Sequence, residues 1–178
     1  MRIALVTDAW FPQINGVVRT LSRVVRELEA LGHEIAVIAP CDFRTLPCPT
    51  YPEIRLALLP GRGVRRRLEA FRPDAIHIAT EAPLGFAARR YCLKRGLPFT
   101  TSYHTRFPEY VSARFPVPLS WGYRVMRRFH RPSAGVMVAT RSLAEELTRR
   151  GFANLKPWTR GVELSLFHPR PDEPPPVA

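Results

Sequence analysis

The sequence predicts an α/β protein built on a doubly wound, mainly parallel sheet with helices on both faces. Short β-prone apolar runs alternate with amphipathic helical segments along almost the whole chain. The first strand-loop-helix-strand unit, residues 3–39, has a crossover length that suits parallel pairing. A chain of 178 residues is long enough for one sizeable core. We therefore expect a single folded domain.

The N-terminal unit shows the pattern most clearly. Residues 3–6 form a compact apolar, β-prone run, and residues 8–16 are rich in turn formers. Apolar residues then recur at three- and four-residue spacing over 17–31, which predicts an amphipathic helix that Gly32 ends. A second buried strand is expected at 35–39.

The alternation continues along the rest of the chain. Strands are expected at 54–59, 75–79, 98–102, 135–139 and 155–159, and helices at 64–71, 84–94, 119–129 and 141–150. A Pro-rich loop is expected before the helix at 119. The stretch 162–178 is dense in proline without an apolar period, so we assign residues 1–161 to the folded domain and 162–178 to a linker or a cut end.

The charge balance favours a polyanionic partner, since 27 Lys and Arg face 15 Asp and Glu. Two Arg clusters, 62–72 and 124–131, interleave Arg with apolar residues at helical spacing. This pattern suits a helix lying on an anionic membrane, and equally an ordinary solvated face. Three cysteines without ligand spacing predict neither disulfides nor a metal site. No apolar run is long enough to cross a membrane, so we expect a cytoplasmic protein.

Three segments that follow expected strands are candidate ligand loops, because ligands of parallel sheets bind beyond the carboxyl ends of the strands. In the first, Gly16 lies at the mouth of a helix, where a phosphate can bind; the alternative is a simple Asn15-Gly16 turn with positive φ. The glycine fingerprints of dinucleotide sites and P-loops are absent. In the second, Glu81 is a ligand contact or merely favours a helix N-terminus.

The third segment, 102–110, places His104, Thr105 and Arg106 directly after a strand, among aromatic residues. A histidine there can bind a hydroxyl group and an arginine can bind phosphate; the alternative is an ordinary structural loop. His77 lies inside a strand pattern and is expected to be a packed histidine. No nucleophile with a supporting base is evident, and no pair of carboxylates is committed to acid-base work.

Four segments in order resemble a family of retaining glycosyltransferases with the two-domain GT-B fold, which includes phosphatidylinositol mannosyltransferases, glycosyl and sulfoquinovosyl diacylglycerol synthases, and sucrose synthase. The segments are IALVTDAWFPQINGVVRTL with GHEIAVIAP, then RPDAIHIATEAPLG, then PFTTSYHTRFPEY, and last VATRSLAEEL with RGVELSLFHP. Each is weak alone, but together they carry the resemblance from residue 1 to about 170.

The resemblance implies that the chain is the N-terminal, acceptor-side, Rossmann-like half of such an enzyme. His104 matches the catalytic histidine that contacts the transferred sugar near the reacting carbon. Asn15 and Gly16 match the loop that approaches the donor diphosphate and the acceptor. We count Glu81, Thr105 and Arg106 as further substrate-binding candidates.

The implied reaction moves a hexosyl group from GDP-mannose or a UDP-sugar to an acceptor, expected to be a membrane lipid head group, without metal or other cofactor. The resemblance also implies that the basic pair and the glutamates of the EX7E segment belong to a C-terminal donor-binding domain absent from these residues, so the chain alone is expected to transfer no sugar. The alternative is a basic module that binds anionic lipid or nucleic acid without catalysis, with nucleic acid the less favoured partner. A dinucleotide-dependent oxidoreductase is disfavoured by the missing fingerprint.

Overall fold

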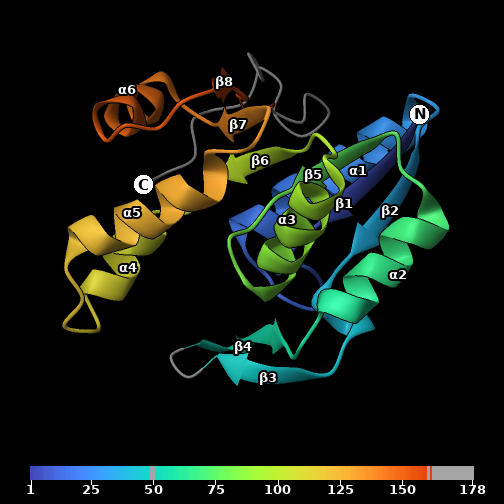
Figure 1. Ribbon diagram of the computed structural model, residues 1–178, viewed down its shortest axis with the longest axis horizontal. Coiled ribbons are helices and arrows are strands. Elements are labelled where there is room, and N and C mark those ends of the chain that lie inside the picture. Colours follow the sequence, from blue (N-terminus) through green and yellow to red (C-terminus); the bar gives the residue numbers. More distant parts are fainter. Residues whose placement is uncertain (49–50, 160, 162–178) are drawn as a thin grey trace, which may run out of the picture.

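A computed structural model describes residues 1–48, 51–159 and 161. Its centre is a six-stranded sheet in the order β2-β1-β5-β6-β7-β8, and every neighbouring pair is parallel (Figure 1). The strands are β1 Arg2–Val6, β2 Glu34–Ile38, β5 Ala75–Ile78, β6 Thr100–Tyr103, β7 Gly135–Val138 and β8 Leu155–Pro157. The strand order reverses direction at β1, so the predicted doubly wound parallel sheet is confirmed.

Helices cover both faces of this sheet. They are α1 Gly16–Ala30, α2 Gly61–Phe71, α3 Pro83–Arg95, α4 Phe107–Ser112, α5 Leu119–His130 and α6 Arg141–Arg149. Alternate residues of β1 reveal the two layers, since successive side chains of a strand point to opposite faces. Ala4 and Val6 pack in the core cluster that contains residues of α2 and α3, whereas Leu5 packs with Leu21 of α1.

Glycines follow the ends of two helices, and an asparagine side chain caps the start of one. Gly32 and Gly96 follow α1 and α3 with φ of +81° and +64°, a left-handed conformation that favours glycine. At the start of α1, the Asn15 side chain accepts hydrogen bonds from the Val17 and Val18 N–H groups, both at 3.0 Å. Helix α1 is therefore set by its own local sequence.

Two predictions about local structure were wrong. The strand expected at 54–59 is β4, Tyr51–Ala57, which pairs antiparallel with β3, Thr45–Cys48, in a separate two-stranded sheet. Two strands this close in sequence form an antiparallel hairpin at a lower entropic cost than parallel pairing with the central sheet, which needs a long crossover connection. The Pro-rich loop contains helix α4, whose Pro108 occupies the first turn, where a missing N–H costs nothing.

None of the helices in the described part of the chain is both long and apolar enough to cross a membrane. The predicted linker, 162–178, lies outside the described residues, as does most of the RGVELSLFHP segment.

Candidate functional site

The predicted site residues lie on loops, or at the start of helix α1, at one edge of the sheet. The parallel strands β1, β5 and β6 are consecutive in the sheet, so their carboxyl ends share this edge, which we call the rim. Asn15 and Gly16 follow β1, Glu81 follows β5, and His104 begins the loop after β6. The reversal of strand order falls between β1 and β5, the position at which open α/β sheets bind ligands.

Asp8 joins the first two rim loops. Its buried carboxylate accepts hydrogen bonds from the N–H groups of Leu84 at 3.0 Å and Gly85 at 3.3 Å, and from the Thr80 hydroxyl at 2.9 Å. It therefore caps α3 from another loop, because Ala82 at the N-cap has no side-chain acceptor. Burial raises the pKa of Asp8 to about 6, although these three hydrogen bonds act in the opposite direction.

Gly16 is the first residue of α1 and does not have a positive φ, so the simple-turn interpretation is wrong on this point. A Cβ added there would meet nothing within 4 Å. The glycine is thus required neither by backbone conformation nor by packing inside the described chain. Asn15 already occupies two of the N–H groups at this helix end, so a phosphate would compete with its side chain for them.

Glu81 makes a polar contact that the sequence did not suggest. Its carboxylate lies 3.0 Å from Nε2 of His130, whose other ring nitrogen lies 2.9 Å from the Thr101 hydroxyl. Both the Glu81 and His130 side chains are almost wholly buried. The sequence placed His130 in a solvent-facing Arg cluster, whereas the helix turns this residue inward toward β6 and the rim. Glu81 thus has a structural partner, and its predicted contact with substrate stays a prediction.

His104 packs against an aromatic residue that sequence reasoning missed. Its ring centroid lies 5.6 Å from that of Trp158, which follows β8 and belongs to the apolar cluster containing Val17 of α1. Trp158 thus packs both on His104 and on the apolar cluster that contains Leu5 and Leu21. The same indole ring contacts His77, whose ring nitrogens each lie 2.8 Å from a hydroxyl, that of Thr100 or Ser102.

His77 is the packed histidine that the sequence predicts. Burial, followed by the nearby His104, lowers its pKa to about 4. It therefore stays neutral near neutral pH and adds no charge beside His104.

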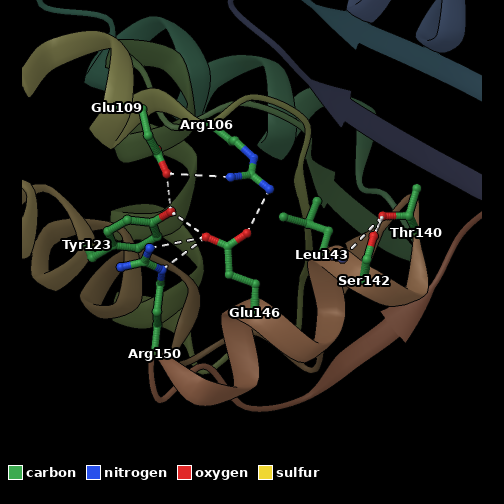
Figure 2. A network of polar contacts seen from close by, with 8 residues as sticks. All are labelled: Arg106, Glu109, Tyr123, Thr140, Ser142, Leu143, Glu146 and Arg150. Carbon is green, nitrogen blue, oxygen red and sulfur yellow. Dashed lines mark hydrogen bonds and ion pairs between the residues drawn. The ribbon is translucent and has the colours of Figure 1, made fainter. Parts of the chain in front are cut away.

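Thr105 and Arg106 are exposed, and Arg106 is engaged with acids on two helices. Its guanidinium group lies 2.7 Å from Glu146 of α6 and 4.0 Å from Glu109 of α4. Figure 2 shows Glu146 between Arg106 and Arg150, with the Tyr123 hydroxyl directed at the carboxylates of Glu109 and Glu146. An anion that bound Arg106 would have to compete with these carboxylates.

Within residues 1–48 and 51–159, no three His, Cys, Asp or Glu side chains lie close enough together to hold a metal ion. Sequence reasoning missed Trp158, His130 and the capping role of Asp8. Each contact depends on residues far apart in the chain, so only the fold reveals it. One signal for Asp8 was present in the sequence, because a charged residue directly after an apolar strand lies at the end of that strand. In the structure Asp8 is buried there.

Comparison with known proteins identifies the family of the chain. Residues 14–166 match the family described as Glycosyltransferase Family 4. A GDP-mannose-dependent α-mannosyltransferase of Mycobacterium tuberculosis is 27% identical over 190 residues, covering 95% of this chain and 50% of the relative. An α-monoglucosyldiacylglycerol synthase of Acholeplasma laidlawii is 30% identical over 126 residues, covering 62% of this chain and 31% of the relative.

Solved structures with the same fold include sucrose-phosphate synthase from Thermosynechococcus elongatus, with a TM-score of 0.63 at 16% identity, covering 96% of this chain and 51% of that one. The UDP-GlcNAc 2-epimerase of Methanocaldococcus jannaschii superposes with a TM-score of 0.56 at 14% identity, covering 89% of this chain and 45% of that one. The chain spans about half the length of the mannosyltransferases it matches. With its parallel sheet, its rim loops and a family match over most of its length, the chain belongs to glycosyltransferase family 4.

Proposed function

We propose that this chain is the acceptor-side half of a retaining glycosyltransferase that moves a hexosyl group from a nucleotide-diphosphate sugar, GDP-mannose or a UDP-sugar, to a membrane lipid head group. The proposal is supported by the position of Gly16, Glu81 and His104 after the neighbouring strands β1, β5 and β6, within a chain of family 4. The names of the relatives support the donor and the acceptor class, because they include GDP-mannose-dependent α-mannosyltransferases and an α-monoglucosyldiacylglycerol synthase.

His104 is the residue to which we assign contact with the transferred sugar. Its ring packs on Trp158, which restricts its orientation, and a neutral imidazole can donate a hydrogen bond to a sugar hydroxyl or accept one from it. Gly16 leaves open space at the start of α1, where the helix dipole favours the negative charge of a diphosphate. These residues bind and orient the substrates, and no step here calls for a metal.

The opposite wall of the cleft is assigned to a second Rossmann-like domain. Stabilisation of the leaving diphosphate supplies much of the rate in such transfers, and Arg106, the candidate cation of the third rim loop, is already paired with Glu146. The chain would act at the inner face of the cell membrane, with its basic surface toward the lipid.

A basic module that binds anionic lipid or nucleic acid without catalysis is the second candidate. Residues 82–144 favour it, because they contain eleven Lys or Arg and a single acid, Glu109. The two candidates differ in their response to a nucleotide sugar. A binding module needs none and shows no thermal shift with one, whereas a transferase half that forms part of a donor cleft is stabilised by it.

The test is a transfer assay with labelled GDP-mannose or UDP-glucose and lipid vesicles. The purified 178-residue chain is expected to give no labelled lipid, and a longer protein in which a donor-binding domain follows it is expected to give labelled lipid. In that longer protein, His104→Ala should lower turnover by roughly a hundredfold or more, as loss of a contact at the reacting centre does. Turnover by the 178-residue chain alone would contradict the division of labour between two halves.

A further inference from the structure

The hairpin formed by α4 and α5 carries an unusual set of exposed side chains. Phe107, Tyr110, Phe115 and Trp121 all lie within fifteen residues of one another, and about half of each side chain is exposed, with 54% for Trp121. The hairpin projects away from the central sheet (Figure 1). Large aromatic residues gathered on a projecting element are typical of an interaction surface rather than of a solvated one.

The charges on α5 complement these aromatic groups. Trp121, Arg124 and Arg128 recur at spacings of three and four residues and are all exposed, so they form one stripe along the helix. The opposite face of α5 is buried through Tyr123, Met126 and Phe129. The helix thus has a buried apolar face and an exposed face that carries one aromatic residue and two arginines.

The acid closest to this stripe in sequence is turned away from it. Glu109 is the single acid within 82–144, and it accepts a hydrogen bond from Tyr123 on the inward side of the hairpin. Arg114 lies over the rings of Tyr51 and Tyr110, with 5.2 Å from its guanidinium carbon to each ring centroid. The exposed residues of the hairpin therefore combine aromatic rings with two arginines, Arg124 and Arg128, that form no ion pair with the described acids.

From these observations we infer that the exposed residues of the α4–α5 hairpin, Phe107, Tyr110, Phe115, Trp121, Arg124 and Arg128, dock the protein on an anionic phospholipid bilayer. Aromatic side chains insert at the level of the lipid head groups while arginines pair with lipid phosphates. The biological purpose of this docking rests on the proposed function. Helix α4 begins three residues after His104, so docking here would bring lipid head groups to the rim.

The shape of the surface favours a bilayer over a nucleic acid. Proteins that stack bases on aromatic side chains place them in a groove that follows the phosphate backbone. Here the aromatic residues lie on a projecting hairpin with a tight helix crossing, where a Cβ on Gly122 would come within 2.9 Å of Pro108. A projecting, positively charged hairpin with exposed aromatic rings can enter the surface of a membrane.

The test is sedimentation of the 178-residue chain with two kinds of vesicle, pure phosphatidylcholine and phosphatidylcholine mixed with phosphatidylglycerol. Binding is expected only to the anionic vesicles and to weaken with salt. Arg124→Gln with Arg128→Gln should weaken it by about twenty-five-fold, at about fivefold for each arginine near the surface. Trp121→Ala should weaken it by roughly tenfold through lost apolar burial.

A matched control is available on α2. Arg65→Gln with Arg66→Gln removes the same charge from an exposed basic helix and is expected to weaken binding less than about threefold. Quenching of tryptophan fluorescence by brominated lipid should be lost in Trp121→Phe while sedimentation persists, because phenylalanine keeps an apolar ring at this position. Unchanged circular dichroism shows that each variant is folded.

Three outcomes would overturn the inference: equal losses for the α5 and α2 pairs, full binding by Trp121→Ala, or binding to single-stranded DNA but not to vesicles. The assay contains no sugar donor. Vesicle binding without sugar transfer in the longer protein would therefore count against the proposed function alone, and transfer without hairpin-dependent binding would count against the docking surface alone.

Discussion

At the scale of single residues, the rim is held by polar side chains that face one another across neighbouring loops. Asp8 caps α3 from the first loop, and Glu81 contacts His130 from the second. Such groups are costly to bury, so each needs a partner at hydrogen-bond distance. Gly16 differs from them, because nothing in the described chain explains it. This contrast separates residues that hold the rim from one that leaves open space beside it.

Two glycines of the rim make a matched pair for mutation. A Cβ on Gly85 would lie 1.9 Å from the carbonyl oxygen of Thr80, so Gly85→Ala should lower the free energy of unfolding by at least about 2 kcal/mol. Gly16→Ala meets open space in a helix and should leave stability unchanged or raise it by up to about 1 kcal/mol. Urea denaturation measures both. A large loss in Gly16→Ala would assign that glycine a structural role.

Asp8 predicts a pH dependence of stability. Its folded pKa of about 6 lies above its unfolded value of about 3.9, so the folded protein holds a proton that the unfolded chain has released. Protonation of Asp8 makes its full contribution to the free energy of unfolding below about pH 4, and this contribution is lost as the pH rises through about 6. Wild type should therefore gain about 1 kcal/mol between about pH 7 and about pH 5 relative to Asp8→Ala. Parallel curves for the two proteins would refute the raised pKa.

At the scale of elements, the sequence predicted what depends on local periodicity. The strands and helices of the central sheet lie within a few residues of their expected positions, because runs such as 17–31 repeat with the period of a helix. Strand β4 was predicted, but strand β3, its antiparallel pairing with β4 and helix α4 were missed. Their segments are rich in proline and lack a clear period, so pairing and packing decide their conformation rather than pattern. The family resemblance indicated His104, but not its contact with Trp158.

Helix α6 holds the loop that follows β6 through Glu146. This carboxylate lies within 3.2 Å of both Arg106 and Arg150 and is only 19% exposed. Glu146→Ala should destabilise the protein by roughly 1–2 kcal/mol and speed amide hydrogen exchange in α4, since Arg106 loses its nearest acid.

The neighbouring Glu145 is the control, because it contacts exposed Arg141 on the same helix. Glu145→Ala is expected to change stability by less than about 0.5 kcal/mol and to leave exchange in α4 unaltered. Equal effects of the two substitutions, read by hydrogen-exchange mass spectrometry, would show that Glu146 does not anchor the loop.

At the scale of the whole molecule, the sheet brings three loops that are distant in sequence to one edge. β1, β5 and β6 are neighbours, although about a hundred residues separate the first from the last. Parallel strands place all the loops that follow them at the same end of the sheet, and we propose that these loops form one wall of a cleft. The family relatives extend over about twice the length of this chain, and we assign the facing wall to that further length.

The most direct test of this wall is a nuclear magnetic resonance titration of the isotope-labelled chain with a soluble lipid head group such as inositol phosphate. We expect the amide signals of Gly16 and Val17 to shift together with those of His104 and Thr105, with one dissociation constant. His104→Ala should raise the dissociation constant obtained from each of these signals. Shifts confined to the Arg clusters of α2 and α5, or to one rim loop alone, would contradict this expectation.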